Sequence, residues 1–153
     1  QTLRWEVEDK TGLNHCQFSL DGSELFTGGL DGCIRVWSTA DGKLLREHDA
    51  SADNAPATAV YAFVLSRDGK FLAWCGRTGG LLPSHIVIAK ANTLEVLHRI
   101  PAHDADGRIL AAYPGGFCSG SVDRTVKFWD WQTMQPESAI SCELDDPEGT
   151  AEL

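Results

Sequence analysis

The sequence has 153 residues and a net charge of −9, from 13 Lys and Arg against 22 Asp and Glu. With 42% hydrophobic and 23% charged residues it is typical of a folded globular chain, and no apolar run approaches the roughly 20 residues that cross a bilayer. The acidic balance argues against nucleic acid and anionic membranes as partners, because both attract clusters of Lys and Arg. Basic or neutral protein surfaces are the natural complement.

Strand and turn signals fall into three successive groups. The first group has expected strands at residues 13–19, 24–29, 33–38 and 43–47, separated by Asp-Gly turns at 21–22, 31–32 and 41–42. The second has expected strands at 60–66, 71–75, 86–89 and 94–100, and the third at 108–113, 117–119, 125–129 and 138–144. Near Trp37 and Trp129 apolar residues come close to alternating with charged ones, which is the period of a strand with one buried face. These patterns predict antiparallel hairpins in an all-β protein.

Two stretches, residues 25–37 and 116–130, repeat one spacing. In each, a small hydroxyl residue stands four positions before an Asp, and a Trp stands six positions after that Asp. The residues are Thr27, Asp31 and Trp37 in the first stretch, and Ser119, Asp123 and Trp129 in the second. Self-similarity at a fixed offset is typical of repeat architectures. These residues resemble the WD40 repeat, in which Trp129-Asp130 would be the dipeptide that names the family. The resemblance implies a segment of a β-propeller with about three four-stranded antiparallel blades.

The WD40 resemblance also implies a hydrogen-bond relay that locks each blade, running from Trp through Ser or Thr and His to Asp. The third group of strands matches all four positions, with His103, Ser119, Asp123 and Trp129. The first group matches three positions, with Thr27, Asp31 and Trp37, but Lys10 stands where the His should be.

The second group departs most from this pattern. His48 is in place, but Trp74 and Thr78 stand at the Ser and Asp positions, and Ala89 or Ile88 replaces the Trp. A half-satisfied buried relay is costly. We therefore expect this blade to be held by the apolar packing of Tyr61, Phe63, Phe71, Leu72 and Trp74.

The expected domain organisation is one partial propeller over residues 1–153. It comprises the outer strand of a preceding blade at 2–7, blades at 13–49, 57–102 and 103–144, and an acidic tail at 145–153. Propellers close with about 4–8 blades, so three blades predict a larger ring. We expect the remaining blades to come from the rest of a longer chain, or less readily from another chain, and the initial Gln1 favours an N-terminus further upstream.

The cysteines and catalytic signatures argue against a metal site and against catalysis within this segment. Cys16, Cys33, Cys75, Cys118 and Cys142 are odd in number and form no CxxC pair. Four of them lie on expected strands as small buried hydrophobes, which favours a reducing compartment and an intracellular, cytoplasmic protein. No GxSxG, P-loop or HExxH motif is present. We expect no cofactor.

The candidate partner-binding residues come from the repeat length. Asp31 and Asp123 are 92 residues apart, or 46 per repeat, against roughly 40–45 in WD40 repeats, so the second blade carries the surplus in loops 50–57 and 77–84. The resemblance implies that both loops reach the same face of the ring. The predicted patch is Arg77, Leu81, Leu82 and Pro83, with Leu30, Val122 and Arg124 from neighbouring turns. The favoured function is a non-catalytic protein–protein interaction scaffold. The alternative is the propeller portion of a multidomain enzyme or regulator whose catalytic part lies outside this segment.

Overall fold

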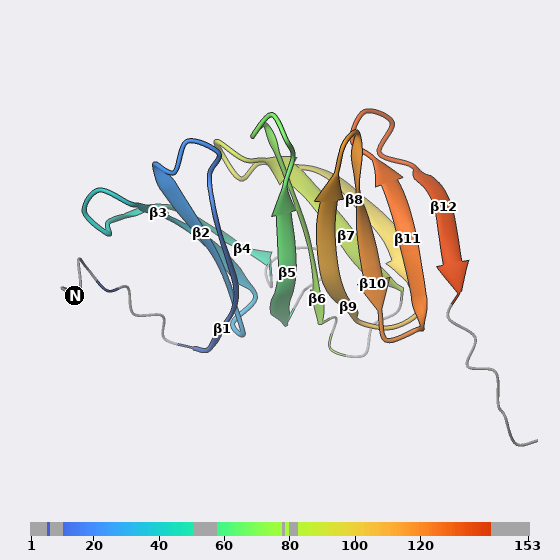
Figure 1. Cartoon of the computed structure of the whole chain (residues 1–153). Coiled ribbons are helices and arrows are strands. Elements are labelled where there is room, and N and C mark those ends of the chain that lie inside the picture. Colours follow the sequence, from blue (N-terminus) through green and yellow to red (C-terminus); the bar gives the residue numbers. More distant parts are fainter. Residues whose placement is uncertain (1–5, 7–10, 51–57, 78, 80–82, 142–153) are drawn as a thin grey trace, which may run out of the picture.

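The computed structural model describes residues 6, 11–50, 58–77, 79 and 83–141, and these form three four-stranded sheets (Figure 1). The first sheet contains β1 (Leu13–Phe18), β2 (Glu24–Gly29), β3 (Cys33–Ser38) and β4 (Leu44–Asp49). The second contains β5 (Ala59–Leu65), β6 (Phe71–Arg77), β7 (Ser84–Lys90) and β8 (Val96–His103). The third contains β9 (Gly107–Tyr113), β10 (Gly116–Ser121), β11 (Thr125–Asp130) and β12 (Pro136–Ser141).

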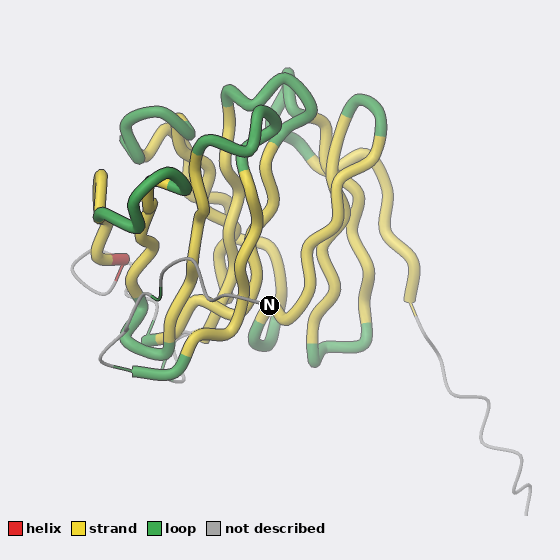
Figure 2. Tube along the Cα trace, turned by 60° about the vertical axis from the view of Figure 1, so that its left-hand side comes forward, coloured by secondary structure: helices red, strands yellow, loops and turns green. Residues whose placement is uncertain are grey.

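Every sheet is an antiparallel meander, in which consecutive strands are neighbours. The turns therefore separate into two ends of the molecule (Figures 1 and 2). The turns between the second and third strands of the first and third sheets lie at the lower end of Figure 1, at residues 30–32 and 122–124, and β6 of the second sheet also ends there at Arg77. The turns between first and second strands and between third and fourth strands lie at the upper end, including 19–23, 66–70, 114–115 and 131–135.

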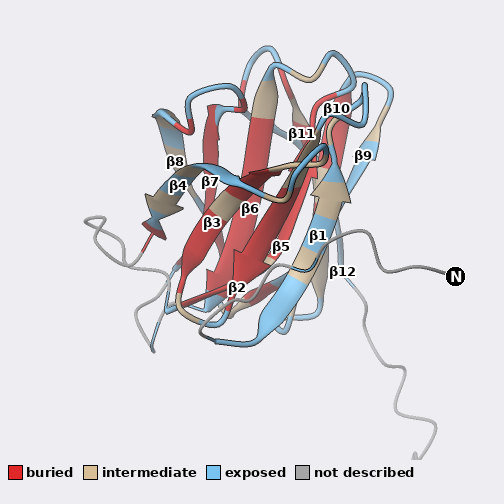
Figure 3. Ribbon diagram, turned by 90° about the vertical axis from the view of Figure 1, so that its left-hand side faces the viewer, coloured by how far each residue is buried: buried red, intermediate tan, exposed pale blue. Residues whose placement is uncertain are grey.

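Two apolar cores hold the three sheets face to face. The core between the first and second sheets includes Phe26, Ile34 and Trp74. The core between the second and third includes Ile86, Phe117 and Trp129. The second sheet is buried on both faces, and accordingly its strands β5 and β7 are near-continuous apolar runs, AVYAFVL and SHIVIAK. Figure 3 shows this contrast, with buried strands in the middle and exposed residues along β1 and β9.

The predicted all-β architecture of three four-stranded antiparallel blades is confirmed. The last strand of the third sheet begins at Pro136, ahead of the expected start at 138, and the expected residues 142–144 lie outside the described ones. The expected burial of the strand cysteines was wrong in part. Cys33 and Cys75 are buried, but Cys16 is exposed and Cys118 is half-buried, because these two lie on the faces of the outer sheets that turn away from the second sheet. Cys142 lies outside the described residues.

The five apolar residues expected to hold the second blade divide between its two faces. Phe63, Leu72 and Trp74 belong to the core with the first sheet. Phe71 packs against the core with the third sheet, and the Tyr61 ring lies 4.2 Å from the Arg108 guanidinium. The second blade is thus anchored to both neighbours.

Large apolar side chains remain exposed on the two outer sheets. They include Phe18 and Leu20 on the first sheet and Ile109 and Ile140 on the third. Among the residues that the structure describes, no helix is long and apolar enough to cross a membrane.

Candidate functional site

The third sheet contains a continuous hydrogen-bond relay made of His103, Ser119, Asp123 and Trp129. The Trp129 indole Nε1–H donates to Ser119 Oγ at 2.8 Å. Ser119 Oγ lies 2.8 Å from His103 Nε2, and His103 Nδ1 lies 2.9 Å from Asp123 Oδ2. Strand β11 supplies the Trp, β10 the Ser and β8 the His, so the relay ties three strands from two sheets together.

The electrostatics of this relay favour a neutral imidazole and an ionised carboxylate. Burial lowers the pKa of His103, and this outweighs the raising effect of the neighbouring Asp123. Burial works against ionisation of Asp123, but hydrogen bonds from Thr125, from the Asp104 backbone and from His103 lower its pKa to about 2. Nδ1 therefore carries the imidazole proton and donates to Asp123, while Ser119 donates its hydroxyl proton to Nε2. The roles of Thr125 and the Asp104 backbone were missed in the sequence.

The first sheet has the same Trp–Thr bond but a different partner for the Asp. Trp37 Nε1–H donates to Thr27 Oγ1 at 2.8 Å. Asp31 accepts from the Cys33 backbone at 3.0 Å and pairs with Arg35 at 2.7 Å. Burial opposes ionisation of Asp31, and the Arg35 guanidinium reverses this effect, so the net pKa is lowered. Arg35 was missed in the sequence, and Lys10 lies outside the described residues.

The second sheet holds no Trp–Ser pair at the corresponding positions. Trp74 has the place of Ser119, because each pairs with the same position of the preceding strand, Phe63 and Leu110 respectively. Ala89 has the place of Trp129, because each pairs with the residue two positions before Trp74 or Ser119 on the neighbouring strand, Leu72 and Phe117 respectively. The register thus selects Ala89 over Ile88 as the counterpart of the Trp. The His48 ring lies 5.3 Å from the Trp74 ring. Trp74 Nε1 is buried and has no hydrogen-bond partner among the described residues. Thr78 lies outside them.

The predicted partner-binding residues are spread along the lower end. Arg77 and Pro83 are exposed at the two ends of the β6–β7 turn, whereas Leu81 and Leu82 lie outside the described residues. The Thr58 amide donates to the Arg77 carbonyl at 2.7 Å, which brings the ends of the two long loops together as expected for neighbours on one face. Leu30 is 51% exposed in the β2–β3 turn of the first sheet.

Val122 and Arg124 lie together in a hollow of about 250 Å³ on the third sheet, which Arg108 and Ile109 also line. Val122 and Ile109 are both more than half exposed. Arg124 has a φ of +67°, and its counterpart in the first sheet is Gly32, with a φ of +79°. An L-residue with a side chain reaches this left-handed region only at a cost that glycine avoids. The described residues provide no hydrogen bond or ion pair to the Arg124 guanidinium.

The described residues contain no group of three His, Cys, Asp or Glu side chains that could hold a metal ion. Their four cysteines are all free thiols. Burial raises the pKa of the Cys75 thiol to about 12 and that of Cys33 to about 11, which makes both poor nucleophiles at neutral pH.

Comparisons with known proteins agree with this geometry. The family model described as "WD domain, G-beta repeat" matches residues 2–38 and 94–130. Protein groucho of Drosophila melanogaster is 26% identical over 142 residues, covering 87% of this chain and 18% of the relative. Protein HIR1 of Kluyveromyces lactis is 31% identical over 147 residues, covering 78% of this chain and 17% of the relative. The chain thus spans less than a fifth of the length of these relatives.

Solved structures show the same fold. The crystal structure of the RRP9 WD40 repeats superposes with a TM-score of 0.79 at 23% identity, covering 88% of this chain and 40% of that one. The structure of U3-55K gives a TM-score of 0.78 at 23% identity, covering 88% and 41%. With the repeated Asp–Trp spacing, the relay of the third sheet and the three antiparallel blades, the two matched segments identify WD40 repeats in this chain, and the superpositions show the β-propeller fold.

Proposed function

We propose that this chain is a non-catalytic protein–protein interaction scaffold that presents the lower end of its blades to protein subunits or peptides within a larger assembly. The proposed contact surface consists of the predicted residues Leu30, Arg77, Leu81, Leu82, Pro83, Val122 and Arg124, extended by Arg108 and Ile109. Binding residues commonly lie on loops that a rigid scaffold positions, as these turns are positioned by the sheets.

The observation that carries this proposal is the backbone of Arg124. The turn needs a left-handed residue, and the first sheet satisfies that need with Gly32. The third sheet keeps Arg124 there despite a cost of about 1–2 kcal/mol for a residue with a Cβ. A strained residue whose guanidinium forms no hydrogen bond or ion pair with the described residues points to a role outside the fold.

The chemistry of the hollow describes the surface that fits it. Arg124 and Arg108 line this hollow with the exposed side chains of Ile109 and Val122, in a chain whose net charge is −9. The Arg108 guanidinium also lies over the Tyr61 ring and 3.7 Å from Asp106, whereas that of Arg124 has no such partner among the described residues. Arg side chains next to apolar groups are common at protein interfaces, where guanidinium pairs with carboxylate in a bidentate manner. The proposed partner surface therefore combines an apolar residue with Asp or Glu.

The test is the substitution Arg124→Gly, which gives the third sheet the residue that the first sheet uses at this turn. We expect the free energy of unfolding to stay the same or rise by up to about 1 kcal/mol, because the strain is relieved while glycine adds unfolded-state entropy. We expect binding of partners to weaken, measured by cross-linking and quantitative capture from cell extract with the full chain as bait. A substitution that acted by destabilising the fold would lower the free energy of unfolding as well as the binding, so it could not give weaker binding at unchanged stability.

Two further variants sharpen the test. Lys43→Ala removes an exposed cation from the upper end and should leave the captured proteins unchanged. The double substitution Leu81→Ser and Leu82→Ser should reduce capture as Arg124→Gly does, without lowering the melting temperature. If both lower-end variants capture the same proteins in the same amounts as the parent chain, this surface is not the binding site.

A further inference from the structure

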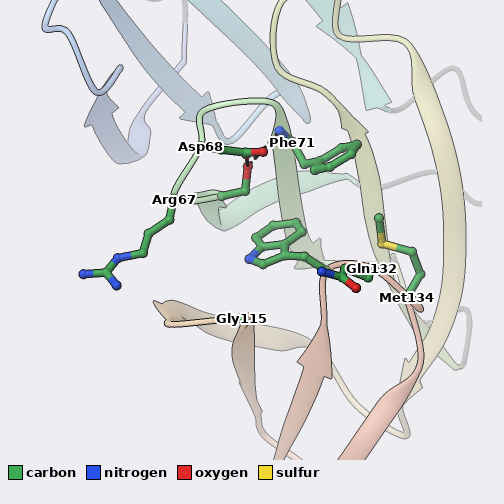
Figure 4. A pocket seen from close by; sticks show the side chains of 8 residues that line it. Arg67, Asp68, Phe71, Gly115, Gln132 and Met134 are labelled. Atoms are coloured by element: carbon green, nitrogen blue, oxygen red, sulfur yellow. Dashed lines mark hydrogen bonds between the residues drawn. The ribbon is translucent and has the colours of Figure 1, made fainter.

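A second hollow lies at the upper end, where the second and third sheets meet (Figure 4). Its volume is about 400 Å³. The second sheet contributes Ser66, Arg67, Asp68 and Phe71, and the third contributes Gly115, Trp131, Gln132 and Met134. None of these residues belongs to the lower-end surface proposed above, and a hollow of this size fits one large side chain with its peptide group.

The equivalent junction between the first and second sheets has an aliphatic side chain at the matching turn position. The turn Ser19-Leu20-Asp21 corresponds to Ser66-Arg67-Asp68, and in both turns the Ser hydroxyl donates to the Asp carboxylate at 2.7 Å. Leu20 Cδ1 crosses to the facing turn and lies 3.5 Å from where a Cβ on Gly69 would be. Leu20 thus contacts the facing turn with one side of its side chain, which is 66% exposed.

The second junction differs in two ways. Arg67 stands at the position of Leu20, and Figure 4 shows its side chain extending away from Phe71 and Met134. The facing turn of the third sheet is also shorter, with Pro114 and Gly115 alone between β9 and β10, against five residues between β5 and β6. The hollow therefore lies where neither the Arg67 side chain nor a long facing turn covers the Phe71 ring.

The walls of this hollow suit an apolar group that carries a hydrogen-bond acceptor. The Phe71 and Trp131 rings are stacked with centroids 6.2 Å apart and planes at 16°. Met134 adds a polarizable thioether, which adapts to different side-chain shapes. Trp131 is 8% exposed, and its buried Nε1–H has no partner among the described residues. A buried donor without a partner is unfavourable, and an acceptor brought in by a ligand removes that penalty.

We propose that this upper-end hollow binds a short peptide segment of a partner protein, which inserts one large apolar side chain flanked by an acidic residue. A backbone carbonyl of the peptide accepts the hydrogen bond from Trp131 Nε1–H. The flanking carboxylate pairs with Arg67, which is exposed and forms no ion pair among the described residues. The inference goes beyond the lower-end surface and depends only on the general role of a protein-binding propeller.

The test uses NMR on the full chain with ¹⁵N-labelled tryptophan, because each of the five Trp residues gives one indole N–H signal. The probe is the acetylated and amidated peptide Gly-Glu-Phe-Glu-Gly, titrated to millimolar concentration. We expect the Trp131 indole signal to shift in a saturable manner. The matched peptide Gly-Glu-Ala-Glu-Gly lacks the large apolar side chain, and Gly-Lys-Phe-Lys-Gly lacks the carboxylates. Both should bind more weakly.

Three variants assign the binding to this hollow. Arg67→Leu removes the guanidinium that pairs with the peptide carboxylate and introduces the Leu found at the matching turn position of the first sheet, and it should abolish the shift while keeping the fold. Trp131→Phe keeps a ring and removes the N–H, and it should weaken binding by roughly 3- to 10-fold, followed in the parent and the variant by the methyl signal of Met134, the one Met of the sequence. Leu20→Ala alters the junction between the first and second sheets and should leave the affinity unchanged.

The outcome is independent of the lower-end proposal. Arg124→Gly should bind the peptide as the parent does, so loss of one surface leaves the other intact. A peptide that binds equally to the parent, Arg67→Leu and Trp131→Phe chains would refute the assignment, as would the absence of any saturable shift or equal binding of the Lys-flanked peptide.

Discussion

Replacing Trp129 by Phe removes one hydrogen-bond donor from the relay and keeps an aromatic ring in the same core. Trp129 is 1% exposed, and its ring stacks on Phe117 with centroids 6.2 Å apart. The lost Nε1–H leaves Ser119, which is fully buried, with an acceptor that water cannot reach. An unpaired buried polar group costs about 1–3 kcal/mol, so we expect the free energy of unfolding to fall by at least this amount.

A double-mutant cycle with Ser119→Ala separates this hydrogen bond from the smaller ring. The packing loss is common to both sides of the cycle and cancels, which leaves a coupling energy for the Trp129–Ser119 bond of about 1 kcal/mol. The assay is urea denaturation followed by far-UV circular dichroism, with the slope of the transition checked for constancy across the four proteins.

The first sheet provides the matched control. Trp37 donates to Thr27 at the same 2.8 Å distance, but no described His orients the Thr27 hydroxyl as His103 orients that of Ser119. Hydrogen bonds joined in series strengthen one another, so the coupling between Trp37→Phe and Thr27→Ala should be the smaller one. Equal coupling energies in the two sheets would show that the relay adds nothing beyond the single Trp bond.

Three other changes test the surrounding structure. Because the pKa of folded His103 lies below 6.5, its contribution to stability is fully present above pH 6.5 and declines as the pH falls below that value, and His103→Gln should flatten this part of a stability–pH curve. A second decline should follow between pH 3.8 and about 2, where folded Asp123 still resists protonation. Trp74→Phe removes a buried donor that has no described partner, so chemical denaturation should show a smaller loss than for Trp129→Phe. Gly76→Ala should destabilise by about 2–4 kcal/mol in the same assay, because its Cβ would lie 1.8 Å from the Ala59 carbonyl oxygen.

The strands and the Ser119–Asp123–Trp129 hairpin of the third sheet could be read from the sequence because the signals are local, whereas His103, on a strand of the second sheet, was placed by the WD40 resemblance. An Asp-containing turn, a Ser four residues before the Asp and a Trp six residues after it fix a hairpin and the side chains that face one another across it. The resulting donor and acceptor atoms lie within 3 Å of one another. Alternation and turn residues likewise located the twelve described strands to within a few positions.

Features that depend on side-chain pairing, on strand register or on contacts between sheets could not be read in this way. Arg35 forms the ion pair with Asp31 in the place where a His was expected. This pairing follows from the positions of the two side chains on the turn and the next strand, and the sequence alone does not show it. The choice between Ala89 and Ile88 depended on strand register, because a shift of one residue reverses the face of every side chain. The upper-end hollow arises between turns centred on Arg67 and Trp131, far apart in the sequence, where no long facing turn covers the Phe71 ring.

Comparing the repeats with one another separates departures that concern stability from those that concern binding. Equivalent positions of the sheets need the same backbone conformation, so a residue that fits this conformation less well than its counterpart indicates another constraint on that position. Arg124 in place of Gly32 puts an exposed cation where glycine serves the backbone, and Arg67 in place of Leu20 puts an exposed cation where the first sheet has an aliphatic side chain. Trp74 in place of Ser119 also departs from the repeat, but it is buried in the core between the sheets, where its ring adds packing. The first two departures are therefore the ones that we propose for binding surfaces, and the third contributes to the packing of the blades.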